Sequence, residues 1–232
     1  TFDVIVSDGE LSDTQNVTVN VNDVNELPTL TSSDTSTVVE NASTDTVVYD
    51  AEATDPDKDN LTYSISGDDA NYVTIDNDNG EVRLLNPTDY ETKDSYTFDV
   101  TASDGELDAT KTVTVNVNDV NDAPTLISSN TSTVEENAST DTVIFNAEAT
   151  DPDNDTLTYS ISGTDASYFT IDSDDGEVRL INSADYETKD SYTFDVKASD
   201  GELDATKTVT VNVNDVNDAP TLISSNTSTV EE

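Results

Sequence analysis

The stretch SYTFDVTASDGELDATKTVTVNVNDVNDAP, residues 95–124, indicates the fold class of this chain. Apolar residues take alternate positions in two runs of it, first Tyr96, Phe98, Val100 and Ala102 and then Val113, Val115 and Val117. An alternation with a period of two is typical of β-strands that bury one face and expose the other. Asp104-Gly105-Glu106 stands between the runs, and aspartate and glycine are frequent in turns. The stretch therefore predicts two β-strands joined by a turn.

The end of this stretch is a short acidic linker, Asp119-Val120-Asn121-Asp122-Ala123-Pro124. It places two carboxylates and a carboxamide within four positions, directly after an apolar run and directly before a proline. Such oxygen ligands suit Ca2+, and the chain has no His or Cys that would favour a softer metal. The linker is therefore predicted to bind a hard cation.

The linker recurs as Asp215-Val216-Asn217-Asp218-Ala219-Pro220 and, altered, as Asp23-Val24-Asn25-Glu26-Leu27-Pro28. Its prolines, at positions 28, 124 and 220, are spaced by 96 residues. This period predicts two complete repeats, 28–123 and 124–219, each a self-contained unit of domain size. Residues 1–27 would be the C-terminal part of a preceding repeat and residues 220–232 the start of a further one, so the chain is expected to be a slice of a longer array.

The composition is strongly acidic, with 51 acidic against 8 basic residues and a formal net charge of -43. Such a charge disfavours nucleic acid and anionic membranes as partners and favours cations. No apolar run is long enough for a membrane span, so this segment is not expected to insert into a bilayer. A disordered polyanion is the alternative for such a composition, but the regular alternation favours folded strands.

Each repeat is predicted to form seven short strands and no helix. In the first repeat these lie at 35–39, 46–53, 61–66, 72–75, 81–85, 95–103 and 110–118. The residues expected on or near the inward rows are Val47, Tyr49, Ala51 and Ala53, then Leu61, Tyr63 and Ile65, and Tyr72. Asn79-Gly80 is expected to make a tight hairpin turn. Seven strands in this length predict an all-β fold of tandem Greek-key β-sandwiches of the immunoglobulin-like kind.

Besides the linker, each repeat carries acidic residues at loops and strand ends. In the first repeat these are Glu40 of Glu40-Asn41, Asp55 and Asp57 around Pro56, Asp89 and Glu91 around Tyr90, and Asp104 after Ala102-Ser103. This series resembles the cadherin repeat, whose motifs are an early Glu-Asn, an Asp-x-Asp, an Asp-x-Glu, an Ala-x-Asp and a linker Asp-x-Asn-Asp-x-Pro. The resemblance covers both complete repeats and both partial ones.

The cadherin resemblance implies about three Ca2+ ions at each complete junction between repeats. For the middle junction it implies Glu40, Asp89 and Glu91 from the first repeat, Asp119, Asn121 and Asp122 from the linker, Asp151, Asp153 and Asp200 from the second repeat, and backbone oxygens of Val120, Ala123 and a residue near Asp155. The early, incomplete junction would use Asp23, Asn25, Glu26, Asp55, Asp57 and Asp104. The late one would use Glu136, Asp185, Glu187, Asp215, Asn217 and Asp218.

The same acidic residues have two other interpretations. Aspartate and asparagine also cap turns and strand ends on an acidic surface without any metal. Paired carboxylates also serve in glycoside hydrolysis, but these acids recur in every repeat and lack a recognisable set of nucleophile, base and orienting residue. No enzyme activity is therefore expected.

The expected function is a calcium-rigidified extracellular stalk of a multi-repeat surface adhesin that supports cell adhesion. Near-identical repeats without cysteine resemble bacterial surface adhesins more than animal cadherins. The expected partners are calcium and, through parts outside this segment, a cell surface, another adhesin chain or a glycan. The alternative is a calcium-dependent carbohydrate-binding module, which an exposed aromatic stripe would favour. Adhesion by insertion of an N-terminal tryptophan, as in some animal cadherins, is disfavoured because the chain has no Trp.

Overall fold

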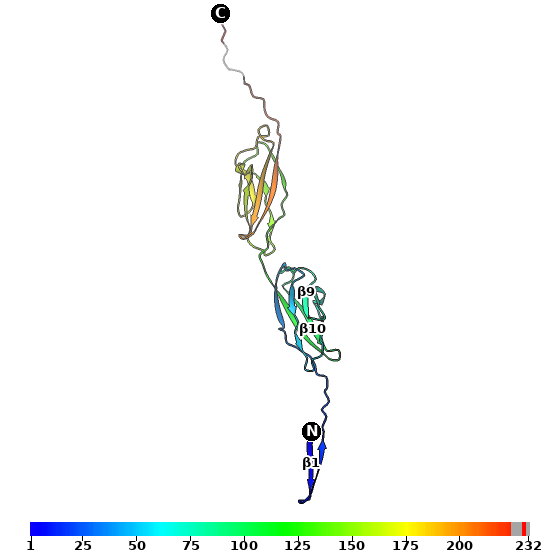
Figure 1. The fold of residues 1–232 in the computed structure, drawn as a ribbon. Coiled ribbons are helices and arrows are strands. Elements are labelled where there is room, and N and C mark those ends of the chain that lie inside the picture. The colour runs from blue at the N-terminus through cyan, green and yellow to red at the C-terminus, as the bar shows by residue number, and fades with distance from the viewer. Residues whose placement is uncertain (224–228, 231–232) are drawn as a thin grey trace. The chain divides into compact units, whose positions relative to one another are not determined.

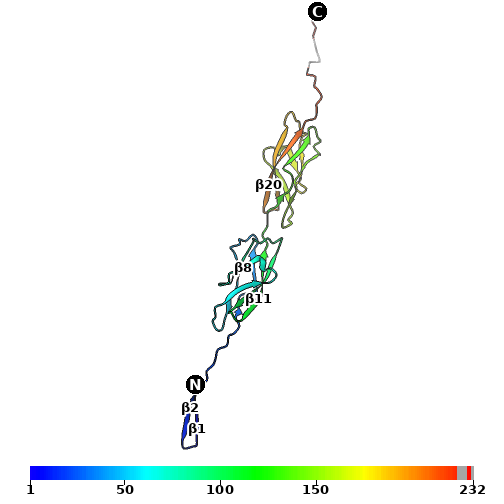
Figure 2. The same cartoon turned by 90° about the vertical axis from the view of Figure 1, so that its right-hand side faces the viewer.

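The computed structural model describes residues 1–223 and 229–230, so the expected start of a further repeat at 220–232 lies partly outside the described residues. The chain divides into two compact units, residues 1–119 and 120–232, which we describe separately (Figures 1 and 2). Both are built from β-strands, which confirms the all-β fold. Within the described part of the chain, no helix has the length and apolar character needed to cross a bilayer.

Unit 1 begins with an antiparallel hairpin and continues as a β-sandwich. The hairpin pairs β1 (Phe2–Ser7) with β2 (Ser12–Val17). One sheet of the sandwich has the order β4 (Thr35–Val39), β11 (Asp108–Asn118), β10 (Ser95–Ser103) and β7 (Thr62–Ser66), and its β4 runs parallel to β11. The other has the order β5 (Val47–Asp50), β9 (Glu81–Leu84) and β8 (Val73–Ile75), with β3 (Thr29–Leu30) paired to β6 (Ala53–Thr54) and a 3-10 turn η1 (Ala70–Tyr72).

Unit 2 repeats this sandwich. Its four-stranded sheet has the order β13 (Thr131–Glu135), β20 (Asp204–Asn214), β19 (Ser191–Ser199) and β16 (Thr158–Ser162). Its three-stranded sheet has the order β14 (Val143–Asn146), β18 (Glu177–Leu180) and β17 (Phe169–Ile171), with β12 (Thr125–Leu126) paired to β15 (Ala149–Thr150) and a 3-10 turn η2 (Ala166–Tyr168). Each of the seven regions expected to form a strand in the first repeat thus contains one, and β3 is an additional short strand.

The core of unit 1 lies between its two sheets and contains the alternating rows of β10 and β11. Every apolar residue of these rows from Tyr96 to Ala102 and from Val113 to Val117 is 6% exposed or less. Phe98 of β10 packs its ring against Tyr49 of β5, with centroids 6.5 Å apart and nearly perpendicular ring planes. Because this contact joins one sheet to the other, it confirms that the two predicted strands form one wall of a sandwich.

The expected strand 46–53 is wrong in two respects. It is divided into β5 and β6, and a register shift lies between Val47 and Tyr49. Val47, expected to face inward, is 38% exposed, whereas Val48 is 2% exposed and Tyr49 is also buried. A bulge places two consecutive side chains on the same side, which a strict period of two does not predict.

Tyr72 is a second correction to the expected core. It ends the 3-10 turn η1 instead of starting a strand, and its side chain is 42% exposed. Its ring packs against the ring of Tyr96, with the ring centroids 5.5 Å apart. Tyr72 therefore covers the edge of the core from outside.

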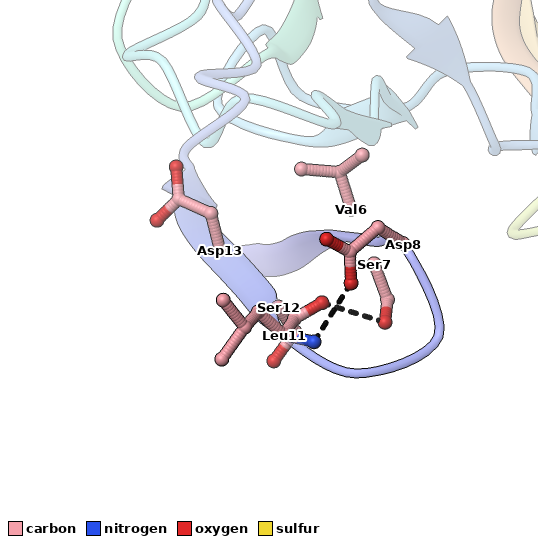
Figure 3. Close-up of a pocket in the computed structure, with 6 residues that line it drawn as sticks. All are labelled: Val6, Ser7, Asp8, Leu11, Ser12 and Asp13. Atoms are coloured by element: carbon pink, nitrogen blue, oxygen red, sulfur yellow. Dashed lines mark hydrogen bonds between the residues drawn. The ribbon is translucent and has the colours of Figure 1, made fainter.

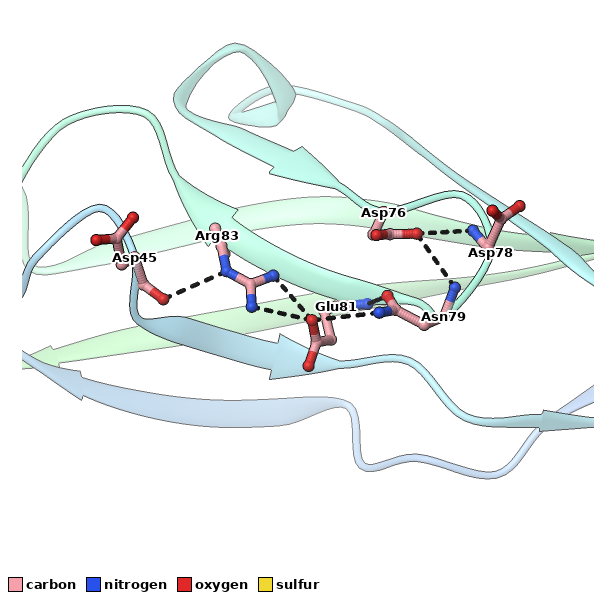
Figure 4. A network of polar contacts seen from close by, with 6 residues as sticks. All are labelled: Asp45, Asp76, Asp78, Asn79, Glu81 and Arg83. Atoms are coloured by element: carbon pink, nitrogen blue, oxygen red, sulfur yellow. Dashed lines mark hydrogen bonds and ion pairs between the residues drawn. The ribbon is translucent and has the colours of Figure 1, made fainter.

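The turn before β9 requires a glycine. Gly80 has φ +78°, and a Cβ atom there would lie 2.3 Å from the carbonyl oxygen of Ala51. The Asp76 carboxylate shapes the same turn by accepting hydrogen bonds from the backbone amides of Asp78 (2.9 Å) and Asn79 (3.3 Å), as Figure 4 shows. A hairpin turn with a positive φ at Gly80 is confirmed, but it is longer than a two-residue Asn-Gly turn, because the last strand pair is Ile75 with Val82 and Asn79 does not have a positive φ. The close approach to Ala51 adds a steric reason for glycine.

Candidate metal centre

A group of acidic side chains lies at the end of unit 1 where β11 leads into the linker. One carboxylate oxygen each of Glu40, Glu91 and Asp119 lie within 4.8 Å of one another. Glu40 is 3% exposed and accepts a 3.0 Å hydrogen bond from the amide of Tyr90. We call Glu40, Glu91 and Asp119 the exit group of unit 1.

Strand register explains how residues far apart in sequence meet in the exit group. The parallel pairing of β4 with β11 sets Val39 opposite Asn118, and the amide of Glu40 then donates to the carbonyl oxygen of Asn118 (3.0 Å). Asn41 follows with φ +57°, a conformation that asparagine tolerates better than most residues. The Glu-Asn pair therefore ends the strand and leaves Glu40 beside the start of the linker.

Unit 2 has an equivalent exit group of Glu136, Glu187 and Asp215, whose ligand oxygens also lie within 4.8 Å. Glu136 is 3% exposed and accepts hydrogen bonds from the amides of Val216 (2.6 Å) and Tyr186 (3.0 Å). These two amides, that of Val216 first, lower the pKa of Glu136. The buried glutamate is therefore held as an anion that a cation can approach.

The Asp-x-Glu motif contributes only its glutamate to each exit group. Asp89 accepts hydrogen bonds from the amide and the hydroxyl of Thr92, both 3.0 Å, and Asp185 makes the same pair of bonds with Thr188. Neither aspartate belongs to the groups within 4.8 Å. In this structure Asp89 and Asp185 cap turns, as the turn interpretation expected.

The Ala-x-Asp aspartates lie at the other end of β11 and β20. Asp104 accepts hydrogen bonds from the amides of Glu106 and Leu107, both 2.7 Å, through one carboxylate oxygen. These bonds, that of Leu107 first, lower the pKa of Asp104. Asp200 has the same partners in unit 2, the amides of Leu203 and Glu202, and its pKa is lowered for the same reason. Both aspartates are therefore fixed as anions, and each keeps a second oxygen that these amides do not use.

The hairpin at the start of the chain repeats this turn. Figure 3 shows Asp8 accepting from the amide of Leu11 (2.8 Å), while the Ser7 hydroxyl donates to the carbonyl oxygen of Leu11 (2.8 Å). Asp8 thus occupies in the hairpin the place that Asp104 and Asp200 occupy in the complete sandwiches. The turn geometry comes from the local Ser-Asp-Gly sequence and needs no other part of the fold.

The linker residues of unit 2 bond to its acidic loops. The Asn121 side chain donates to the second carboxylate oxygen of Asp200 (3.0 Å), and the amide of Asp122 donates to Asp153 (2.8 Å). The structure therefore gathers the linker, the Asp-x-Asp loop and the Ala-x-Asp turn at one end of this unit. We call Asn121, Asp122, Asp151, Asp153 and Asp200 the entry group of unit 2.

Unit 1 has the same arrangement at its start. Asn25 donates to Asp104 (3.0 Å), and the amide of Glu26 donates to Asp57 (2.8 Å). Ligand oxygens of Asp23, Glu26 and Asp57 lie within 4.8 Å of one another. The charge of Asp57 is the main cause that raises the pKa of Glu26. This repulsion between neighbouring carboxylates is what a divalent cation would relieve.

The Asp-x-Asp loops offer the clearest place for a metal. Asp55 accepts the amide of Asp57 (2.9 Å) through one carboxylate oxygen, while its other oxygen is buried and has no hydrogen-bond partner among the described residues. Asp151 has the same bond to the amide of Asp153 (3.1 Å) and the same unpartnered buried oxygen. A buried anionic oxygen without a partner is costly, and a hard cation such as Ca2+ is the ligand that would satisfy it. The residues present therefore fit calcium.

Several predicted ligands are not gathered in this way. Asn217 donates to the backbone of Asp218 (3.3 Å) and not to an aspartate side chain. The backbone oxygens of Val120 and Ala123, predicted as ligands, remain predictions. The carboxylates of Asp59 and Asp155 also lie within 4.8 Å of the Asp-x-Asp pairs, which was not expected, although the spacing Asp-x-Asp-x-Asp in both loops was a visible signal.

The carbohydrate-binding alternative depended on an exposed aromatic stripe. In the first repeat, Tyr72 and Tyr90 are the exposed aromatic side chains, at 42% and 36%. The ammonium group of Lys93 lies over the Tyr72 ring, 5.8 Å from its centroid. A ring covered in this way is a poor platform for a sugar, so the described residues do not favour this alternative.

The comparisons with known proteins agree with the fold. The model of the Cadherin domain matches residues 34–118 and 130–214. Human Protocadherin Fat 1 is 38% identical over 171 residues, which are 68% of this chain and 4% of that protein. Human Cadherin-23 is 38% identical over 154 residues, 64% of this chain and 5% of that protein. The chain thus spans about a twentieth of the length of these relatives.

Solved cadherin structures share the architecture. Human Protocadherin-24 EC1-2 superposes with a TM-score of 0.66 at 24% identity, over 83% of this chain and 100% of that one. Mouse Cadherin-23 EC22-24 gives 0.61 at 28% identity, over 84% of this chain and 68% of that one. These relatives are animal proteins, so they give no support to the expected bacterial adhesin. Two matched domains, the shared fold and the acidic motifs show that this chain belongs to the cadherin family.

Proposed function

We propose that this chain is a calcium-rigidified extracellular spacer within a longer cadherin that supports cell adhesion. The cadherin family consists of adhesion proteins found at cell surfaces, and cadherin domains bind Ca2+ at the junctions between repeats. The chain would hold about three Ca2+ ions at its complete junction and would act as a structural module, not as an enzyme. Partners that recognise the adhesin would bind the longer protein elsewhere.

The observation that carries this proposal is the position of the two acidic groups along the chain. The exit group of unit 1 ends at Asp119, and the entry group of unit 2 begins at Asn121. Consecutive Cα atoms are about 3.8 Å apart, so Asp119 and Asn121 are tethered within about 7 Å. This short tether supports the proposal that both groups supply ligands to shared Ca2+ ions.

Charge explains why calcium would stiffen the linker. Two carboxylates 4.8 Å apart repel by at most about 3.5 kcal/mol at an effective dielectric constant of about 20, and solvent and salt reduce this repulsion for such partly exposed groups. Ca2+ replaces this repulsion with shared ligation, which ties the linker to both units. Extracellular modules bind Ca2+ with dissociation constants of about 0.1–1 mM, so the linker would become stiff only outside the cell.

Calorimetry on the whole chain tests the proposal with a matched pair of variants. Asp122→Ala removes a linker carboxylate between two complete repeats, and Asp218→Ala removes the same residue from the identical motif that follows the second repeat. We expect the unaltered chain to bind about three Ca2+ ions in its tightest class. Asp122→Ala should lose that class while Asp218→Ala retains it. Absence of a tight class in the unaltered chain, or equal losses in both variants, would contradict the proposal.

A further inference from the structure

The loops 55–59 and 151–155 each carry a third aspartate that the cadherin motif does not assign. One carboxylate oxygen each of Asp55, Asp57 and Asp59 lie within 4.8 Å of one another. The loop of unit 2 has the same arrangement of Asp151, Asp153 and Asp155. Each loop therefore brings three anionic oxygens together from five consecutive residues.

Hydrogen bonds from backbone amides close each loop around its first aspartate. In unit 1 the amides of Asp57 (2.9 Å) and Asp59 (3.3 Å) both donate to the same oxygen of Asp55, and the amide of Lys58 donates to the Asp55 carbonyl (3.2 Å). Lys58 has φ +67°, which reverses the chain between Asp57 and Asp59. In an extended strand, by contrast, side chains two positions apart lie in a row along one face, so three of them would not converge on one point.

Unit 2 builds the same loop with a different residue at its centre. The amides of Asp153 (3.1 Å) and Asp155 (3.2 Å) donate to one oxygen of Asp151, and Asn154 takes the place of Lys58 with φ +62°. The exchange of Lys58 for Asn154 changes the loop's charge but not its geometry. The three aspartates, and not the central residue, are therefore the common elements.

A second observation points to a ligand inside each loop. The other oxygen of Asp55, and likewise that of Asp151, is buried and lacks a hydrogen-bond partner among the residues that the structure describes. Each loop thus contains a buried carboxylate oxygen without a partner in a residue that lies beside two further carboxylates. Mutual repulsion makes such a cluster unfavourable by itself, whereas a Ca2+ ion accepts six to eight oxygen ligands.

We propose that Asp59 and Asp155 are direct ligands of the Ca2+ held by the Asp-x-Asp aspartates of their loops, a role that the cadherin motif does not give them. This inference rests on the proposed calcium-binding function and adds a ligand to it. Calcium loops of the EF-hand kind use oxygens at positions 1, 3 and 5 in the same way.

The test is calcium calorimetry of the whole chain carrying Asp59→Ala and Asp155→Ala. Both residues are exposed, so the fold should survive, which far-UV circular dichroism checks. The control carries Asp78→Ala and Asp174→Ala, two exposed loop aspartates outside the groups within 4.8 Å, and removes the same charge. We expect the Asp59/Asp155 variant to weaken one class of sites by at least about tenfold, as loss of metal-site partners does, while the control changes little.

One further arm makes the result decisive. Asp59→Asn with Asp155→Asn keeps an oxygen at each position and should weaken binding less than alanine. If the unaltered chain binds no Ca2+, the proposed function fails and this inference with it. If it binds Ca2+ but the Asp59/Asp155 variant and its control behave alike, only this inference is overturned.

Discussion

The hydroxyl of Tyr49 donates a 2.6 Å hydrogen bond to the carbonyl oxygen of Ser33 and lies 2.7 Å from the hydroxyl of Ser32. In the second repeat Phe145 takes the place of Tyr49, and the hydroxyl of Ser128, which corresponds to Ser32, is buried without a partner among the described residues. Desolvation by burial raises the pKa of Tyr49, so it stays protonated as a donor at neutral pH. A side-chain oxygen that is hydrogen-bonded in the core of unit 1 is thus missing from the core of unit 2.

Restoring this oxygen should stabilise the second repeat. We expect Phe145→Tyr to raise the free energy of unfolding of unit 2 by about 1 kcal/mol, because it satisfies Ser128. Tyr49→Phe should lower that of unit 1 by a similar amount. Differential scanning calorimetry in calcium-free buffer measures both, and a change of this size shifts Tm by about 4–8 °C in a domain of this length. A lower Tm for Phe145→Tyr would show that the space beside Ser128 does not admit the hydroxyl.

Alanine substitutions at Gly80 and Gly105 distinguish the cost of a strained backbone from the cost of a steric clash. Gly105 has φ +100°, and a Cβ atom at this position would have no neighbour within 4 Å, whereas a Cβ at Gly80 would lie 2.3 Å from the carbonyl oxygen of Ala51. Gly105→Ala should therefore cost about 1–2 kcal/mol from conformation alone. Gly80→Ala should cost more, because β9 must also move away from β5. Urea denaturation of both variants checks this order, and equal costs would mean that the Ala51 contact is relieved without loss.

Asp172 makes part of the stability of unit 2 dependent on pH. The amides of Asp174 and then Asp175 lower the pKa of Asp172 below its ordinary value. A carboxylate with a lowered pKa in the folded state contributes stability that is fully present above its unfolded pKa, about 3.9, and is lost as the pH falls through the folded value. Asp172→Asn should therefore lose less stability than the unaltered chain between neutral pH and pH about 2.

Urea denaturation in metal-free buffer across this pH range measures the difference. If Asp172→Asn lost as much stability on acidification as the unaltered chain, its hydrogen bonds would not favour the ionised form.

The sequence was sufficient to predict the strands wherever burial imposes a period of two. Phe98 and Val113 stand in long alternating runs, and both are buried. Val47 was assigned wrongly because the bulge beside it depends on how β5 meets β9, which no local pattern encodes. Tyr72 was placed in the core because it precedes an apolar run, but the 3-10 turn rotates it outward.

The candidate site was predictable as far as motifs reflect local geometry. Asp200 lies in a turn that its own Asp-Gly sequence shapes, and the structure places it beside Asn121 as expected. Asp89 stays a predicted ligand, and the structure adds that its carboxylate accepts hydrogen bonds from the amide and the hydroxyl of Thr92, three residues later. Asp59 was overlooked because its approach to Asp55 requires a positive φ at Lys58, which is unusual for a lysine.

The central claim is that calcium stiffens the linker, and pulsed electron paramagnetic resonance tests it most directly. The chain has no cysteine, so spin labels can be attached at Asn86→Cys and Asn182→Cys, two exposed positions in equivalent loops of the two repeats. We expect a narrow distribution of label-to-label distances with millimolar Ca2+ and a broad one after chelation with EGTA, and Asp122→Ala should remain broad in both. A distribution of equal width with and without Ca2+ would contradict calcium-dependent rigidity.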